Sequence, residues 1–167
     1  MAKMYLMTGP SGAGKTTFAK KFAEDNHLQY LGIDDFYALI NGSDQRHEDE
    51  TDVWLIFYKA IQLAEQHGRD IIIDTNAPTP TKRTQFLDWF STFEPHLIYV
   101  TAGYDLCQKN NQTRSRIIPQ DQFDEMYYDY VAPEFSEDKR WQSVASFINH
   151  FNKKYMIVSQ FNRDDEV

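Results

Sequence analysis

The distribution of apolar and polar positions predicts short buried strands that alternate with amphipathic helices. Strands are expected at five places: Met4–Met7, Leu28–Ile33, Arg69–Asp74, His96–Thr101 and Tyr155–Ser159. Within the third of these, the uninterrupted run Ile71–Ile73 is typical of a parallel strand that is buried on both faces. Strands that alternate with helices in this way indicate an α/β fold with three layers around a parallel sheet of five strands.

Helical spacing of apolar residues is expected between these strands. The predicted helices are Thr17–Glu24, Phe36–Ile40, Val53–Ala64, a helix that begins at Pro80, Asp105–Asn110, a helix from Pro119 to about Val131, and Trp141–Phe151. In the helix after Pro80, four side chains are expected to pack inward: Phe86, Leu87, Trp89 and Phe90. The polar, acidic segment Ser43–Asp52 is predicted to be a surface loop.

Length and composition narrow the class of protein. A chain of 167 residues suits one domain, expected over residues 1–161, and the charged tail at 162–167 is expected to fray. The single cysteine, Cys107, excludes an intramolecular disulfide and a metal site built from cysteines. The net charge of -8 is unlike that of a protein that coats duplex DNA, although a local basic site for one nucleic-acid end stays open. No apolar run approaches a membrane span, so a cytoplasmic protein is expected, and no obligate protein partner is evident.

The segment Gly9–Thr16 reads GPSGAGKT and fits the phosphate-binding pattern G-x-x-x-x-G-K-[ST]. Its glycines allow the backbone to curl until successive N–H groups face one anion. Lys15 is then expected to reach the β- and γ-phosphates, and the Thr16 hydroxyl to ligate Mg²⁺. A strand before the loop and a helix after it provide the helix N-terminus that anion binding requires. The residues expected to bind ATP here are Gly9, Ser11, Gly12, Ala13, Gly14, Lys15, Thr16 and Thr17.

Carboxylates follow two of the predicted strands, at the edge where ligands of parallel sheets bind. Asp74 ends the isoleucine-rich strand, where it can hold Mg²⁺, directly or through water, or orient an acceptor. Asp34 or Asp35 follows another strand, where a carboxylate can take the proton of an attacking hydroxyl. Either residue can instead be the N-cap of the following helix. For Asp35, the capping role and the catalytic role have equal weight.

A basic segment interrupts this acid-rich chain. From Leu106 to Gln120 there is no acidic residue, and the segment includes Arg114 and Arg116. It resembles the lid of small kinases, in which arginines close over the triphosphate, and the lid is expected at about residues 109–120. The alternative is a solvated basic loop. The pair Lys82-Arg83 is a weaker candidate for ligand binding.

Together these residues resemble the polynucleotide-kinase-like branch of P-loop kinases, in particular phage-type 5′-hydroxyl polynucleotide kinases. The shared elements are Gly9–Thr16, Asp34–Phe36, Ile73–Asn76, Lys82-Arg83, Asp105–Asn111, Arg114, Ile118-Pro119 and Met126. The resemblance implies a P-loop kinase fold with strand order 2-3-1-4-5 and a helical lid over ATP. It implies Asp34 as general base and Arg114 as the arginine that stabilises the transferring phosphoryl group, with Asp74 and Arg83 on the acceptor side.

Two positions depart from the pattern of that branch. Members that act on nucleic-acid ends carry an arginine three residues after the base, where it holds the acceptor's phosphate. This chain has Tyr37 there, which can stack a base instead. A basic residue common in the lid helix is Asn110 here. The residues expected at the acceptor are Asp34, Asp35, Tyr37, Asp74, Asn76 and Arg83.

These observations predict an ATP-dependent kinase with Mg²⁺ as cofactor and Asp34, Lys15 and Arg114 as catalytic residues. The predicted acceptor is the 5′-hydroxyl of a nucleic acid or nucleotide. A kinase of small molecules, or one similar to the zeta-type toxins, shares the same motifs and stays open. An alternative of another class is a nucleotide-binding ATPase or switch without an acceptor.

Overall fold

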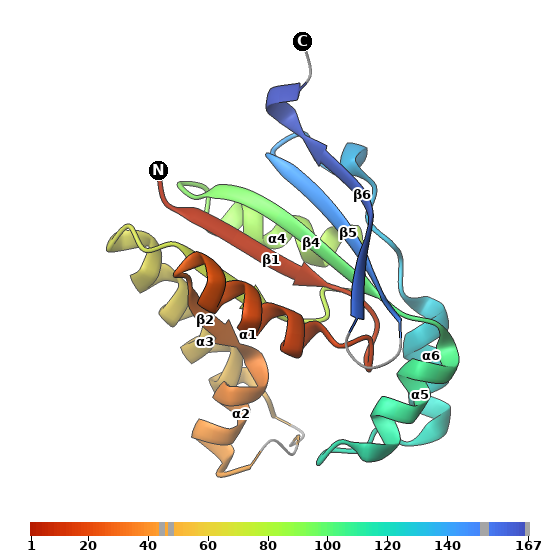
Figure 1. Cartoon of the computed structure of the whole chain (residues 1–167). Helices are drawn as coiled ribbons and strands as arrows, with labels where there is room; N and C mark the ends of the chain where they lie inside the picture. The colour runs from red at the N-terminus through yellow and green to blue at the C-terminus, as the bar shows by residue number, and fades with distance from the viewer. Residues whose placement is uncertain (44–45, 47–48, 151–153, 166–167) are drawn as a thin grey trace.

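The computed structural model describes residues 1–43, 46, 49–150 and 154–165. One sheet of six strands runs through these residues, in the order β2-β3-β1-β4-β5-β6 (Figure 1). The strands are β1 (Lys3–Thr8), β2 (Gln29–Gly32), β3 (Ile71–Asp74), β4 (Glu94–Thr101), β5 (Ser143–His150) and β6 (Lys154–Asn162). Strands β1 to β5 are parallel to one another, whereas β6 runs antiparallel to β5.

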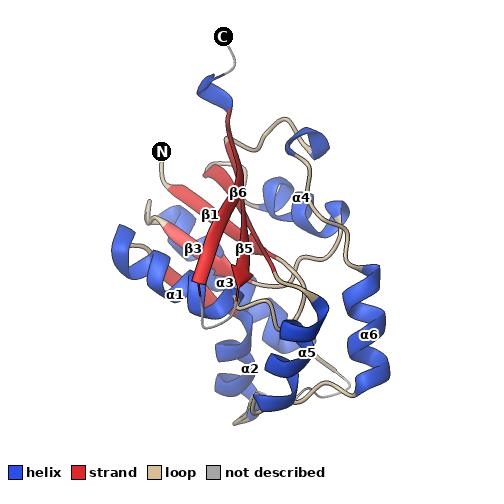
Figure 2. Cartoon of the chain, turned by 45° about the vertical axis from the view of Figure 1, so that its right-hand side comes forward, coloured by secondary structure: helices blue, strands red, loops and turns tan. Residues whose placement is uncertain are grey.

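Helices cover both faces of the sheet and complete the three layers (Figure 2). They are α1 (Lys15–Asn26), α2 (Ile33–Asn41), α3 (Thr51–Gln66), α4 (Pro80–Trp89), α5 (Tyr104–Thr113) and α6 (Gln120–Asp129), with short 3₁₀ turns at Phe135–Glu137 and Arg163–Asp165. One core cluster joins the sheet to α3 and α4, and the other joins it to α1, α5 and α6. Ile71 and Ile73 belong to the first cluster and Ile72 to the second, so β3 is buried on both faces. The predicted α/β P-loop kinase fold is thereby confirmed.

The sheet differs from the prediction at its C-terminal end. Residues 141–151 are predicted to be helical, and of these residue 151 lies outside the described residues. The structure instead places β5 there, between β4 and β6. Val144 pairs with Leu97 on one side and Phe161 on the other. The predicted fifth strand is therefore β6, and the sheet has six strands with an antiparallel edge. The predicted order 2-3-1-4-5 therefore differs from the structure at this end, because β5 lies between β4 and the strand that was predicted as the fifth.

One smaller expectation is also wrong. Trp89 was expected to pack inward, but its side chain is half exposed at the end of α4. Fraying of the tail stays a prediction, although its first residue, Asn162, ends β6 and pairs with Ser143. Arg163 donates to the carbonyl of Trp141. Residues 166 and 167 of the predicted tail lie outside the described residues.

The register of the strands places three connecting loops together, at the C-terminal ends of β1, β2 and β3. Leu6 of β1 lies beside Ile73 of β3, and Gly32 of β2 lies beside Asp74. Because these strands are parallel, the loops that follow β1, β2 and β3 leave the sheet together. In Figure 1, α2 and the α5–α6 pair lie on the two sides of this edge. Over the described part of the chain, no helix combines the length and the apolar content that a membrane crossing requires.

Candidate active site

The loop between β1 and α1 has the backbone of an anion-binding site. Gly12 and Gly14 have φ angles of 83° and 92°, in the left-handed region that favours glycine. Helix α1 begins at Lys15 with no side-chain cap and no acidic residue in its first turn. Its first N–H groups therefore carry the positive end of the helix dipole without an internal partner, as a phosphate site requires.

The β5–β6 hairpin holds this loop from outside. The Asn149 amide donates to the carbonyl of Ala13 at 3.1 Å, and the Tyr155 hydroxyl donates to the carbonyl of Gly14 at 2.8 Å. A Cβ on Gly14 would lie 2.7 Å from Asn149 Nδ2, so glycine is also required for this close approach. Sequence reasoning missed both residues because their segment was assigned to a helix and to an independent strand.

Two further asparagines hold the other half of the loop. The Asn110 amide on α5 donates to the carbonyl of Gly12 at 2.8 Å. The Asn76 amide, after β3, donates to the Ser11 hydroxyl at 3.2 Å. Asn110 is one of the two positions that depart from the resembling kinases, and its contact shows why an amide suits it. These bonds engage carbonyl and hydroxyl oxygens of the loop. The N–H groups of Gly9 and Ala13 donate to the carbonyls of Asn76 and Pro10, so only part of the N–H groups of the loop is left to face an anion.

Lys15 is only 7% exposed, and its ammonium donates to the carbonyl of Pro10 at 3.0 Å. Burial lowers the pKa of Lys15 to about 8, although the negative charge of Asp74 opposes that shift. A bound triphosphate adds negative charge beside the ammonium and favours its protonated form. Nucleotide binding and protonation of Lys15 are therefore expected to be linked.

We expect the affinity for ATP to fall as the pH rises through about 8, because the free protein then loses the Lys15 proton that the complex needs. Above that pH, the loss approaches about tenfold per pH unit, which is the limit for one linked proton. Titration calorimetry between pH 7 and pH 9.5 measures it. The Lys15→Arg variant is the control, because a guanidinium stays charged and its affinity should not change over this range. An equal loss in both proteins would contradict the assignment to Lys15.

Thr16 and Asp74 form a pair that fits a magnesium ion. The Thr16 hydroxyl donates to Asp74 Oδ2 at 2.7 Å, and the Tyr30 hydroxyl donates to the same oxygen at 2.6 Å. Burial and the charge of Asp74 raise the pKa of Tyr30, which keeps it a neutral donor. A hydroxyl with one buried carboxylate is a donor set that Mg²⁺ accepts alongside phosphate oxygens and water. Tyr30 carried no motif in the sequence and was missed.

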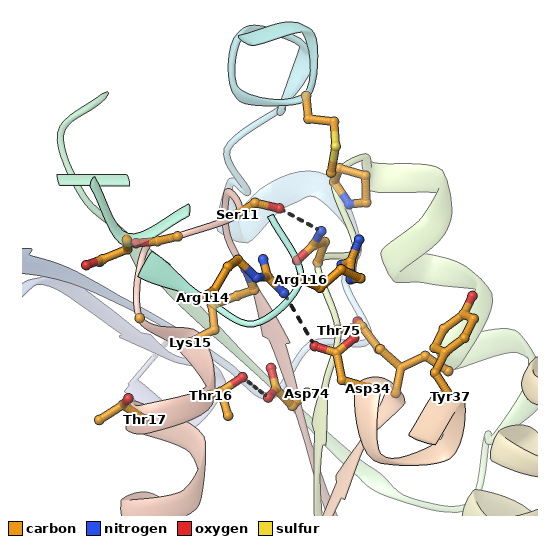
Figure 3. Close-up of a pocket in the computed structure, with 18 of the residues that line it drawn as sticks. Ser11, Lys15, Thr16, Thr17, Asp34, Tyr37, Asp74, Thr75, Arg114 and Arg116 are labelled. Atoms are coloured by element: carbon orange, nitrogen blue, oxygen red, sulfur yellow. Dashed lines mark hydrogen bonds and ion pairs between the residues drawn. The ribbon is translucent and has the colours of Figure 1, made fainter. Parts of the chain in front are cut away.

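Asp34 and Asp35 lie within the first turn of α2, which begins earlier than predicted. Gly32 is the cap residue of this helix, so the alternative that Asp34 or Asp35 is the N-cap is wrong. Asp34 points into a cavity, where its carboxylate lies 2.5 Å from Arg46 Nη2 and 3.8 Å from Arg114 Nη2 (Figure 3). Asp35 is exposed, and the cavity wall formed by the described residues does not include it.

The lid lies across the cavity from α2. Arg114 follows the last residue of α5, and both Arg114 and Arg116 line the cavity (Figure 3). The buried side chain of Asn111 closes the loop at its base, since it donates to the carbonyl of Ile118 and accepts from the N–H of the same residue. These two hydrogen bonds fix the points at which the loop that carries Arg114 and Arg116 leaves α5 and approaches α6.

Arg83 does not reach the cavity, contrary to the expectation that it faces the acceptor. Its side chain is fully buried, and it donates two hydrogen bonds to the Glu137 carboxylate at 2.8–2.9 Å. The remaining terminal nitrogen donates to the carbonyls of Ala77 and Val131. The guanidinium thus ties α4 to the segment after α6.

The cavity has a volume of about 1170 Å³ and extends from the phosphate loop to α3 and α4. The sequence-predicted residues that line it are Ser11, Gly12, Gly14, Lys15, Thr16, Thr17, Asp34, Tyr37, Asp74, Asn76, Lys82, Arg114 and Arg116. Those absent from its described lining are Gly9, Ala13, Asp35 and Arg83. Beyond Asp34 the wall is aromatic, with Tyr37, Trp54, Tyr58 and Phe86. Thr75 also lines the cavity, and its buried hydroxyl has no hydrogen-bond partner among the residues that the structure describes.

A phosphate-binding loop after β1, a carboxylate at the end of β3 and an arginine-bearing lid define a P-loop kinase-like protein. Solved structures share this fold. An unliganded sugar kinase from Janibacter sp. matches with a TM-score of 0.62 and 17% identity, over 89% of this chain and 86% of that chain. Chaetomium thermophilum Kti12 in complex with ADP-AlF3 matches with a TM-score of 0.66 and 15% identity, over 90% of each chain.

A chain of the Pnkp1/Rnl/Hen1 RNA repair complex matches with a TM-score of 0.68 and 16% identity, over 95% of this chain and 49% of that chain. No curated protein matches the sequence significantly. Residues 4–133 match the profile of the AAA domain family designated AAA_33, and the chain therefore belongs to this family.

Proposed function

We propose that this protein is a phosphotransferase that uses ATP and Mg²⁺ to phosphorylate an acceptor hydroxyl, with the 5′-hydroxyl of a nucleic acid or nucleotide as the best candidate. The observation that carries the proposal is the position of Asp34. Its carboxylate lies in the same cavity as the phosphate loop, opposite the lid residue Arg114. A general base and a cation on the two sides of one cavity are what transfer to a hydroxyl needs.

In this mechanism the phosphate loop and Lys15 bind the β- and γ-phosphates. Thr16 and Asp74 would hold Mg²⁺, which would supply positive charge at those phosphates. Asp34 accepts the proton of the acceptor hydroxyl while the oxygen bonds to the γ-phosphorus and the bond to the β-phosphate oxygen breaks. Arg114 offsets charge on the transferring group, and the lid excludes water. The products are the phosphorylated acceptor, ADP and a proton.

The aromatic wall favours an acceptor that carries a planar ring. Tyr37 is buried beneath Arg46 and Phe86 is buried as well, so the half-buried rings of Trp54 and Tyr58 are the ones that can meet a ligand. Edge-on and tilted contacts with neighbouring rings hold these two side chains. Aromatic side chains of this kind stack nucleobases without regard to sequence. The likeness to a chain of an RNA repair complex is compatible with such an acceptor. The likeness to a sugar kinase keeps a small hydroxylated acceptor as the second candidate.

The test is transfer of label from γ-labelled ATP with Mg²⁺ to a panel of acceptors. The panel contains a 5′-hydroxyl oligonucleotide, nucleoside 3′-monophosphates, free nucleosides, sugars and sugar nucleotides. The Lys15→Ala protein, purified in parallel, is the blank, since transfer that persists without that cation comes from other enzymes. We expect label on the oligonucleotide or the nucleotides. Label on sugars alone would support the second candidate, and hydrolysis unaffected by any acceptor would support an ATPase instead.

A further inference from the structure

Arg46 occupies a position in the cavity that no sequence motif marked. Its guanidinium carbon lies 3.3 Å from the centre of the Tyr37 ring, and its Nη2 lies 2.5 Å from Asp34 Oδ1. It therefore contacts both the proposed base and the residue that replaces an arginine in the resembling kinases. The cation that α2 lacks at position 37 is supplied from the loop between α2 and α3.

The ring beneath Arg46 is held in place. Tyr37 is 1% exposed, and its hydroxyl donates to Glu50 at 2.5 Å and accepts from Trp54 Nε1 at 3.2 Å. Burial, together with the bond to Glu50, raises the pKa of Tyr37 to about 12, so the ring stays a neutral phenol. A neutral, buried ring is a fixed platform for the flat face of a guanidinium.

The contact between Arg46 and Asp34 is open to exchange. The side chains of Arg46 and Asp34 are 27% and 45% exposed, so water and ligands reach the pair from the cavity. An ion pair in such a place contributes little net stability, and a better anion can displace the carboxylate. Phosphate groups suit the fork of N–H donors on a guanidinium, which binds them with two parallel hydrogen bonds.

We propose that Arg46 is an acceptor-sensing latch, which holds Asp34 in the empty site and moves to a phosphate group of the acceptor when one binds. The exchange leaves Asp34 Oδ1 accessible to the acceptor hydroxyl, while Asp34 Oδ2 stays 3.8 Å from Arg114 Nη2. Asp34 then takes the proton of the hydroxyl as the hydroxyl oxygen bonds to the γ-phosphorus of ATP and the bond to the β-phosphate oxygen breaks, which releases ADP. An acceptor with a phosphate near its hydroxyl thus binds tightly and releases the base. This inference rests on the proposed function for its catalytic consequence, whereas its binding consequence can be measured without transfer.

The experiment measures binding to protein that is saturated with Mg²⁺ and a non-hydrolysable ATP analogue, so that the phosphate loop is filled and no transfer occurs. The probes are inorganic phosphate, adenosine 3′-monophosphate and adenosine, followed by calorimetry. The variants are Arg46→Ala, Asp34→Asn and the control Lys59→Ala, which removes an exposed cation on α3. Unchanged circular dichroism and ATP-analogue affinity establish that each variant is folded.

In the unaltered protein, we expect the monophosphate to bind roughly ten- to hundredfold more tightly than adenosine, the range for hydrogen bonds to a charged group. Arg46→Ala should abolish this difference and the binding of inorganic phosphate, while Lys59→Ala keeps both. Asp34→Asn should bind phosphate several-fold more tightly, because the carboxylate that competes for Arg46 is gone. A merely structural role of the pair would not produce this tighter binding.

Equal binding of the two adenosine compounds, or phosphate binding that survives in Arg46→Ala, overturns the inference. Weaker phosphate binding in Asp34→Asn overturns it as well. If the proposed function fails and the inference holds, the results differ from these. The expected differences in binding between probes and between variants then appear, but the unaltered protein transfers no label to any acceptor.

Discussion

Replacement of Asp34 by asparagine is expected to lower the rate of phosphoryl transfer by about two orders of magnitude or more, the range of general-base catalysis. The amide keeps the shape of the side chain but cannot take a proton. ATP binding should stay nearly intact, because the phosphate contacts come from the loop before α1 and from Lys15. Single-turnover transfer measures the chemical step, and calorimetry with ATP measures binding.

The neighbouring Asp35→Asn variant is the matched control for this prediction. It removes the same charge from the same helical turn, but Asp35 is exposed and outside the described cavity lining. We expect it to keep the transfer rate to within about a factor of two, as for exposed substitutions away from a site. If Asp35→Asn were the inactive variant and Asp34→Asn the active one, the assignment of the base would be reversed.

Replacement of Arg83 by alanine is expected to lower the free energy of unfolding by about 3–5 kcal/mol, the usual cost of removing one partner of a buried ion pair. The loss would leave Glu137, whose side chain is 7% exposed, as an uncompensated buried charge. It would also leave the carbonyls of Ala77 and Val131 without this donor. Urea unfolding followed by circular dichroism gives the difference.

Arg140 offers a control of the same residue type. It forms ion pairs with Asp88 and Asp138, but its side chain is 48% exposed. Arg140→Ala should therefore change the unfolding free energy by no more than about 1 kcal/mol. Similar losses in the two variants would mean that burial of the Arg83–Glu137 pair does not determine its contribution.

The parts of the fold that the sequence predicted are those determined by neighbouring residues. The loop from Gly9 to Thr16 depends on glycines, a lysine and a threonine at fixed spacing, and the strand before it and the helix after it follow from local apolar patterns. The run Ile71–Ile73 was likewise sufficient to place a central strand. In these segments the local preference and the tertiary structure agree.

The parts that the sequence did not predict depend on partners far along the chain. The segment that forms β5 has apolar spacing compatible with a helix, and only its pairing with β4 and β6 selects the strand. Arg83 follows a motif and was assigned to a ligand, but Glu137 and two carbonyls engage it. Arg46 belongs to no sequence motif, and only the folded chain brings it to Asp34 and Tyr37.

The β5–β6 hairpin gives the C-terminal part of the chain a share in nucleotide binding. The match to the family ends at residue 133, before either strand begins. Yet Asn149 and Tyr155 fix the carbonyls of Ala13 and Gly14 in the phosphate loop. The smallest unit that keeps this loop in shape is therefore longer than the segment that defines the family. Because β6 is the outermost strand, local unfolding at this edge of the sheet would disturb the phosphate loop before it disturbed the core.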